Sequence, residues 1–541
     1  MSLPKTAEYC SFCCYSVTAS CDKLVGVVHL VYRLKVSQQN SQDMHGLFAL
    51  NADVLSTILS YTGPYDALQL SLTCRDAQRA ALPRFLASVV FPSPWLCSSS
   101  EEPEPEPPVH RHPELYERFR SYMLADGSYR LRQLKALALG EDAFCVHYGG
   151  QGSYAPRHAF TLAAPLADVI RGAAGLHTIR VAHADAIFDA VPQLADAIAS
   201  LPQLQEVCFY DADVSTLEVL SRMHSRPRKV SVRIVEYTGV AQTWWGQYVR
   251  GGSRFLCNFT ETLEVLSLIG GLDILEELEP DTVWPVVREL KLARGPSVNL
   301  QVMSNAFPHL RRLHVECPAA TFIPVDQWRE LDFVFTTHPL PLQHPVRHLK
   351  MSWFSLGPYV PTPQHQALVD STNVMLRNTQ PVVLECSACK SIYSCIARNA
   401  PSVHFLRITG APTRRHSESE RQLSDDMAEA LLTYDFSLLK ILPLKGAAVV
   451  LQRCRPWCEP SHWMRYARVI AACIPTLEYV GLRQQVMARS PVDQWDGSER
   501  YMWYRITGRE EKNEPVIEIL SEEEGNSIHF TLLNLSRDNC D

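Results

Sequence analysis

The chain has 541 residues, of which 46% are hydrophobic and 20% charged, so it can bury a large core and exceeds the usual size of one compact domain. Its formal net charge of -7 leaves no basic field, so a nucleic-acid partner is not expected. The 17 cysteines are scattered, and residues 1–30 lack a secretory signal pattern, so we expect reduced thiols in a cytoplasmic or nuclear protein. The apolar stretch at 24–32 is about half the length of a membrane span, so no membrane association is expected.

Residues 1–46 differ from the rest of the chain and predict a disordered or poorly ordered tail. Cys10 and Cys13 form a CxxC element, but no second pair follows nearby, so free thiols are favoured over zinc. The patterned sequence starts directly after Met44. An open alternative is therefore that residues 1–43 are not part of the native protein.

The stretch LNADVLSTILSYTGPYDALQLSLTCRDAQRAALP at 50–83 predicts helices. After Asn51, a residue suited to an N-cap, the apolar residues fall on one side of a helix at 51–61. They are Val54, Leu55, Ile58 and Leu59.

Gly63 and Pro64 are predicted to end that helix, and Asp66 to cap a second one with Leu68 and Leu72 on one face. A third short segment, PRFLASVVF, is predicted to begin at a further proline, and three helices of about forty residues in total fall near the size below which a lone domain rarely stabilises itself. Part of their apolar surface therefore needs an outside partner.

The order L..DVL..IL.Y....DAL.LSLTCR resembles an F-box, the segment by which substrate receptors of cullin-based ubiquitin ligases dock onto the Skp-family adaptor. Many F-boxes begin with Leu-Pro, where this chain has Leu-Asn. The resemblance places the F-box at residues 47–92, while an ordinary helical hairpin at the edge of a larger domain stays open as the alternative. The residues that it assigns to adaptor binding or to the motif's own core are Leu50, Val54, Leu55, Ile58, Leu59, Leu68 and Leu72.

Residues 93–113 contain repeated prolines and like-charged glutamates, which predict an acidic, Pro-rich linker or exposed loop. From residue 114 to 484 a short template recurs, hydrophobic at its first, fourth and sixth positions, and its last three residues predict a strand with one buried face. The copies are LKALAL (134–139), LHTIRV (176–181), LQEVCF (204–209), LEVLSL (263–268), VRELKL (287–292), LRRLHV (310–315), WRELDF (328–333), VRHLKM (346–351), VHFLRI (403–408) and LEYVGL (477–482).

This pattern resembles an irregular leucine-rich repeat, with weaker copies near 230, 381 and 436. The resemblance implies an α/β solenoid with parallel strands inside and helices outside, the helices including the stretches PLADVIRGAAG and QHQALVDSTNVMLRN. Between the core positions lie side chains of the opposite face, whose mixed charge and scattered aromatics suit a protein-binding surface and equally a solvated one. The candidates for substrate binding are Arg180, Tyr210, Lys291, Arg312, His314, His348, Lys350, Phe405 and Arg407.

Residues 485–541 include the segments ERYMWYRITG and EPVIEIL, which predict a β-hairpin that caps the last repeat. No motif for phosphate, dinucleotide, zinc-protease or serine-hydrolase chemistry occurs in the chain, and the cysteine clusters at 386–395 and 454–462 are interpreted as buried thiols. We therefore predict no catalytic residue, metal or cofactor.

Taken together, the F-box-like segment and the repeat-like strands resemble those of the expanded fungal (basidiomycete) families of F-box proteins with repeats. They imply the substrate-recognition subunit of a cullin-based (SCF-type) E3 ubiquitin ligase, which binds the Skp-family adaptor, through it a cullin, and an unknown protein substrate. The alternative is a non-catalytic interaction scaffold that binds the adaptor or other proteins without directing ubiquitination.

Overall fold

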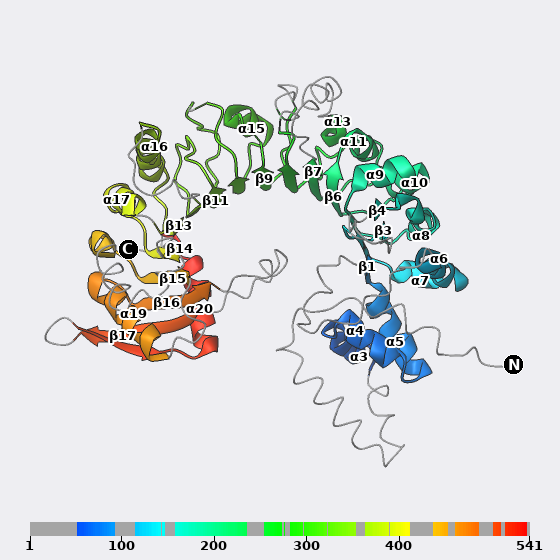
Figure 1. Ribbon diagram of the computed structural model, residues 1–541, viewed down its shortest axis with the longest axis horizontal. Coiled ribbons are helices and arrows are strands. Elements are labelled where there is room, and N and C mark those ends of the chain that lie inside the picture. Colours follow the sequence, from blue (N-terminus) through cyan, green and yellow to red (C-terminus); the bar gives the residue numbers. More distant parts are fainter. Residues whose placement is uncertain are drawn as a thin grey trace, which may run out of the picture. The chain divides into compact units, whose positions relative to one another are not determined.

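The structure is a computed structural model whose chain divides into two compact units, Met1–Leu263 and Glu264–Asp541, each of mixed α/β type with a mostly parallel sheet (Figure 1). The structure describes residues 51–91, 114–141, 143–146, 157–234, 254–272, 275, 282–295, 297–321, 323–352, 363–388, 390–411, 436–452, 460–485, 501–509 and 514–537. The predicted tail at 1–46 and the predicted linker at 93–113 lie outside these residues.

Three helices begin the described part of unit one: α3 (Ala52–Ser60), α4 (Pro64–Ser71) and α5 (Arg75–Leu86). The side chain of Asn51 accepts a hydrogen bond from the Asp53 N–H, so its predicted N-cap role is confirmed. The predicted cap of the second helix is wrong, because α4 begins two residues before Asp66, with Gly63 as N-cap and Pro64 in the first turn. Proline suits that position because its missing N–H would have no partner there.

The end of the helical segment also differs from the prediction. A turn after α4 separates it from α5, and Pro83 lies inside α5 instead of starting a third segment. The residues that come after α5 form β1 (Ser88–Phe91), which pairs in parallel with β2 (Ala136–Leu139). The three helices therefore continue directly into the sheet of unit one.

The parallel sheet of unit one has the order β1-β2-β5-β6-β7, with β5 (Thr178–Val181), β6 (Glu206–Ala212) and β7 (Lys229–Ile234). A separate antiparallel pair joins β3 (Cys145–Val146) and β4 (Arg157–His158). The predicted helix PLADVIRGAAG is confirmed as α8. The other helices described in this unit are α6 (Glu114–Ala125), α7 (Ser128–Gln133), η3 (Phe160–Ala163), α8 (Leu166–Gly172), α9 (Ala184–Ala190), α10 (Pro192–Ala199), α11 (Val214–Ser221) and α13 (Arg254–Cys257).

In unit two, nine strands succeed one another in parallel and in chain order from β8 to β16, and an antiparallel pair, β17 and β18, completes the sheet. The strands are β8 (Val265–Ile269), β9 (Glu289–Ala293), β10 (Arg312–Val315), β11 (Phe333–Thr336), β12 (His348–Met351), β13 (Val383–Ser387), β14 (Phe405–Ala411), β15 (Gly446–Gln452), β16 (Tyr479–Gln485), β17 (Met502–Arg509) and β18 (Pro515–Ile519). The helices are α15 (Leu300–Ala306), α16 (Pro363–Thr379), α17 (Lys390–Asn399), η5 (Ser437–Leu439), α19 (Pro460–Cys473) and α20 (Glu522–Leu533).

The helix predicted from QHQALVDSTNVMLRN is confirmed as α16, and every template copy except one ends in a strand with the predicted face buried. The exception is WRELDF, where β11 starts only at Phe333 and the buried residues of the strand are Val334 and Thr336. Because side chains alternate along a strand, this shift moves Phe333 from the predicted core to the opposite face.

The weaker copies near 230 and 381 are confirmed as β7 and β13, whereas the copy near 436 is wrong. Ser437–Leu439 form a 3-10 turn, and the strand is β15, whose sequence GAAVVLQ begins with small residues that do not fit a leucine template. The predicted hairpin at the C-terminus is confirmed as β17 and β18, and β17 pairs with β16, so that the last parallel strand is no longer an edge. The helix α20, which comes after this hairpin, was not predicted.

In unit two, α16 and α17 lie on one side of the strands and α20 lies on the other (Figure 1). We call the side that carries α20 the inner face. Leucines such as Leu290, Leu313 and Leu349 point away from it and are fully buried. None of the helices in the described parts of the chain combines the length and the apolar composition that crossing a membrane requires.

Candidate functional site

The residues assigned to adaptor binding divide between a core and a surface. Leu59 is 5% exposed and packs with Ala67 and Ala81 in the core of α3, α4 and α5. Val54 and Leu72 are 47% and 53% exposed. The others are half-buried (Leu55, Ile58 and Leu68), and Leu50 lies outside the described residues.

The exposed apolar surface of α3 and α4 is larger than predicted, because Tyr61, at the C-terminus of α3, is 78% exposed. The buried cluster that joins the three helices contains one large side chain, Leu59, next to Ala67 and Ala81, while Leu82 and Leu86 are buried further along α5. Arg84 of α5 donates a hydrogen bond to the Thr62 carbonyl at 3.0 Å and ties α5 to the turn after α3. We refer to these three exposed side chains, Val54, Tyr61 and Leu72, as the helical patch.

The register of unit two aligns the predicted substrate-binding residues in two rows across the inner face. One row runs over neighbouring strands as Glu289, Arg312, Phe333, His348, Val383 and Phe405, and the other as Lys291, His314, Phe335, Lys350, Glu385 and Arg407. Parallel strands in register bring these side chains side by side, although they are far apart in sequence. Seven of the nine candidates therefore share one surface.

On β9 and β10, a single carboxylate is shared by two cations. Glu289 lies 2.9 Å from the Lys291 amine and 3.6 Å from the Arg312 guanidinium. The Arg312 guanidinium also lies over the ring of Phe333, 5.1 Å from its centre. Because these side chains are exposed or half-buried, this strip combines positive charge with an accessible aromatic ring.

A second aromatic ring, that of Phe335, lies between two basic side chains. The His314 ring is 4.0 Å from it, and the Lys350 amine lies 5.6 Å from its centre. His314 also pairs with Glu316 at 2.7 Å. We call Lys291, Arg312, His314, Phe333, Phe335 and Lys350 the uncovered strip, since all six are exposed or half-buried.

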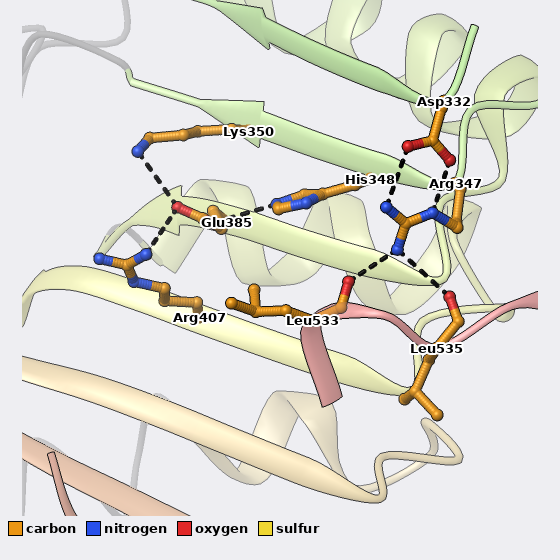
Figure 2. A network of polar contacts seen from close by, with 8 residues as sticks. All are labelled: Asp332, Arg347, His348, Lys350, Glu385, Arg407, Leu533 and Leu535. Atoms are coloured by element: carbon orange, nitrogen blue, oxygen red, sulfur yellow. Dashed lines mark hydrogen bonds and ion pairs between the residues drawn. The ribbon is translucent and has the colours of Figure 1, made fainter. Parts of the chain in front are cut away.

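Next to this strip, Glu385 is at the centre of a buried charge network (Figure 2). Its carboxylate lies 3.0 Å from His348 and 3.3 Å from each of Lys350 and Arg407. Burial by itself would raise the pKa of Glu385, but the hydrogen bond with His348 and the charges of Arg407 and Lys350 outweigh it and lower the pKa to about 2. Glu385 therefore stays ionised at neutral pH although it is only 4% exposed.

Arg347, directly before β12, connects this region to the end of α20 (Figure 2). Its guanidinium forms two hydrogen bonds to the Asp332 carboxylate, at 2.6 and 3.0 Å, and donates to the carbonyls of Leu533 and Leu535 at 2.6 and 3.4 Å. The hydrogen bond from Arg347 lowers the pKa of Asp332, against the effect of burial. A guanidinium that holds the last carbonyls of a helix also complements the negative end of its dipole.

Three of the predicted contact residues are not accessible, which corrects their assignment to a free surface. Phe405 is fully buried, and His348 and Arg407 are each 8% exposed. Phe405 lies in one cluster with Leu532 of α20 and Trp503 of β17, while the other two bind Glu385. We call Val383, Phe405, Ala448 and Val450, which α20 and β17 cover, the covered strip.

The remaining two candidates lie in unit one. Arg180 is exposed and bonds Glu206 at 3.0 Å, and Lys229 bonds the same carboxylate at 3.1 Å. Tyr210 is half-buried, and burial raises its pKa. The structure thus joins Arg180 to a small charge cluster on β5, β6 and β7.

A pair in unit one that sequence reasoning missed is His183 and Asp211, whose Nδ1 and Oδ2 atoms are 2.8 Å apart. The His183 ring also lies 4.7 Å from that of His158, which stacks on Phe160. No spacing in the sequence marks this pair, because it depends on a bulge in β6. Among the described residues, no three His, Cys, Asp or Glu side chains are grouped so that they could hold a metal ion.

Comparison with known proteins finds no family model that matches the chain, and no curated protein that is significantly similar to it. The class of the protein therefore rests on its own architecture. It is a mixed α/β protein of mostly parallel strands, with an exposed apolar patch on its first helices and a row of basic and aromatic side chains on one sheet face.

Proposed function

We propose that this chain is the substrate-recognition subunit of a cullin-based (SCF-type) E3 ubiquitin ligase. In this proposal α3, α4 and α5 are an F-box that docks on the Skp-family adaptor, and the strands form an irregular leucine-rich-repeat scaffold that holds a protein substrate. The chain itself performs no covalent chemistry, and it works in the cytoplasm or nucleus with no cofactor. Its contribution is to raise the concentration of substrate lysines near the catalytic subunits of the ligase.

The observation that carries the proposal is the helical patch. Val54, Tyr61 and Leu72 expose large apolar side chains on a short segment in which the buried cluster that joins the helices contains one large side chain, Leu59. Burial of each large side chain against a partner contributes roughly 1.5 to 3 kcal/mol, so three of them supply a substantial part of a stable interface. The order of apolar residues along α3 and α4 resembles that of an F-box, which is why the partner is taken to be the Skp-family adaptor.

The uncovered strip supports the second half of the proposal. Aromatic residues and Arg are enriched at protein interfaces, and in this strip Arg312 lies over the ring of Phe333 on paired strands. Beside the uncovered strip, the half-buried carboxylate of Glu289 pairs with two of its cations, Lys291 and Arg312. We therefore expect the substrate to contribute acidic side chains there.

The second candidate function is an interaction scaffold that binds the adaptor or other proteins without directing ubiquitination. It is favoured by the same helical patch, since an exposed apolar patch identifies a docking surface and is compatible with docking alone as well as with ubiquitin transfer. The difference between the two functions is whether a cullin joins the complex.

The experiment is affinity capture of the full-length chain with purified Skp-family adaptor and cullin. We expect both to be retained by the unchanged chain, and neither by the double variant Val54→Asp/Leu72→Asp. Ile441→Asp is the matched control, because Ile441 is 67% exposed in unit two and should leave capture unchanged. Retention of the adaptor without the cullin supports the scaffold instead. Capture that survives in the double variant, or no capture by the unchanged chain, overturns the proposal.

A further inference from the structure

The helix α20 occupies the same sheet face that the proposed function gives to the substrate. On α20, Gly525 and Leu532 are buried, and Ile528 and Leu533 pack against the same cluster, as does Leu535 after the end of the helix. Gly525, Ile528 and Leu532 recur at intervals of three and four, which is the spacing of one side of a helix. The covered strip therefore binds an amphipathic helix, and in this structure the helix belongs to the chain itself.

Two glycines, one on the sheet and one on α20, allow the helix to pack closely against the sheet. A Cβ atom on Gly446 of β15 would lie 2.6 Å from a methyl carbon of Leu532, and one on Gly525 would lie 2.8 Å from the ring of Trp503. At both positions the absence of a Cβ atom allows backbone and side chain to approach closely. Leu532 therefore packs directly over Gly446 on the covered strip.

The attachment of α20 is nevertheless limited. Of its 12 residues only Gly525 and Leu532 are buried, whereas α10 in unit one buries five of its 8 residues. Its outward side carries Phe530, which is 71% exposed. The elements with the fewest buried side chains are those that open locally without unfolding of the rest.

At the end of α20, two arginines form hydrogen bonds with main-chain carbonyls. Arg347, itself oriented by Asp332, donates to the carbonyls of Leu533 and Leu535 (Figure 2). Arg537 donates in turn to the carbonyls of Thr379 and Gln380 at 2.9 and 2.8 Å. Arg347 contacts only main-chain oxygens, one at the last residue of α20 and one two residues after it, so any helix that ends at this place can make the contact.

We propose that α20 is a displaceable internal ligand of the covered strip, and that the substrate is an amphipathic helix of the same spacing that takes its place. That α20 is displaceable rests on the contacts of α20 alone, whereas the identity of the substrate as a helix rests on the proposed function. The substrate helix carries a small residue, then aliphatic residues three and seven positions later, and ends at Arg347. When α20 leaves, Phe405 loses its cover from Leu532 beside the uncovered strip.

The first test is native-state hydrogen exchange of the full-length chain. We expect amides of α20 to exchange through a local opening, faster than those of β13, β14 and β15. Arg347→Ala should increase exchange in α20 by about tenfold or more, because hydrogen bonds to a charged group are lost. The control is Arg329→Ala, which removes only an exposed pair with Asp326. Exchange of α20 in step with those strands, or equal effects of the two variants, overturns the proposal.

The second test uses a labelled synthetic peptide of residues 521–537 as the probe. In the full-length variant Leu532→Ala, the internal helix is weakened, so the peptide should bind at least about tenfold more tightly than it binds the unchanged chain. A peptide with Leu532→Asp is the control and should not bind. Equal binding to both chains overturns the proposal.

These outcomes are independent of the adaptor. If peptide binding fails while Skp-family capture succeeds, only the internal ligand is lost. If adaptor capture fails while the peptide binds, the covered strip still binds a helix, and the assignment of that helix as a ubiquitin-ligase substrate is wrong.

Discussion

His183 and Asp211 form an ion pair in which both residues have left-handed backbone conformations, with φ angles of 50° and 54°. Such conformations cost roughly 1 to 2 kcal/mol per residue, although His and Asp adopt them more readily than most. The hydrogen bond between the two side chains raises the pKa of His183 and lowers the pKa of Asp211. The pair therefore offsets backbone strain with an electrostatic contact.

This pair predicts a pH dependence for the stability of unit one. The stabilisation from His183 is complete below its ordinary pKa of 6.5 and is lost as the pH rises through its higher folded pKa. The stabilisation from Asp211 is complete above its ordinary pKa of 3.8 and is lost as the pH falls through its lower folded pKa. We expect the pair to contribute about 1 kcal/mol between these two values and less on either side.

Asp211→Asn is the variant that isolates the charge, since asparagine also tolerates a left-handed backbone. Hydrogen exchange in β5 and β6, measured from pH 5 to pH 9, should show a loss of protection above pH 6.5 in the unchanged chain. That loss should be absent in the variant. A variant that keeps the same pH profile would show that the His183 proton has no part in stability.

The buried network around Glu385 predicts a large effect of one substitution. Glu385→Gln leaves Lys350 and Arg407 next to each other without their shared carboxylate, so the free energy of unfolding of unit two should fall by about 3 to 5 kcal/mol. Chemical denaturation of the full-length chain measures this change in the free energy of unfolding. Because the folded pKa of Glu385 is about 2, its stabilisation is lost as the pH falls from 4.5 through 2.

The control for Glu385→Gln is Glu330→Gln, which removes the carboxylate of an exposed pair with Arg311. An exposed pair of this kind changes stability by about 0 to 1 kcal/mol. If both glutamine variants have the same stability, the network contributes no more than a surface ion pair, and its burial does not matter energetically.

Gly446 gives a test of how tightly α20 packs. In Gly446→Ala the new methyl group would clash with Leu532, and overpacking of this kind costs about 1 to 3 kcal/mol. Gly508→Ala is the matched control, because nothing lies within 4 Å of the added Cβ there. Thermal unfolding should show a lower Tm for Gly446→Ala alone. Equal melting temperatures would mean that Leu532 moves aside at no cost.

The parallel strands were largely predictable because each one carries its own signal. In the copy with Leu310, Leu313 and Val315, the spacing alone predicts a strand with one buried face, and stacking of such units requires no long-range information. The same argument failed for β15, where Gly446, Ala447 and Ala448 occupy the strand. Small residues are selected there by the approach of α20, which local spacing does not encode.

The candidate site was predictable only as a face. Lys350 was placed correctly on the side opposite Leu349, because alternation along a strand decides it. Whether that side is open depends on contacts between segments far apart in sequence. Phe405 is covered by Leu532, more than one hundred residues later, so its burial could not be read from its own neighbourhood.

The division of α3 into core and surface leads to a last prediction. The spacing of its apolar residues defines a broad stripe and does not separate Val54 from Leu59, since both lie on one side of the helix. The structure separates them, because Leu59 is in contact with Ala67 and Ala81 while Val54 is 47% exposed. Leu59→Ala should therefore destabilise α3, α4 and α5 by about 2 to 5 kcal/mol, whereas Val54→Ala should change stability by no more than about 0.5 kcal/mol.

Adaptor capture should respond in a different way to the same two variants. Val54→Ala removes surface that a partner would cover, so capture should weaken although the fold is unchanged. Leu59→Ala should weaken capture only to the extent that hydrogen exchange shows the helices to be open. If Val54→Ala destabilises the helices as much as Leu59→Ala does, then Val54 is a core residue, and the helical patch is too small to serve as the docking surface.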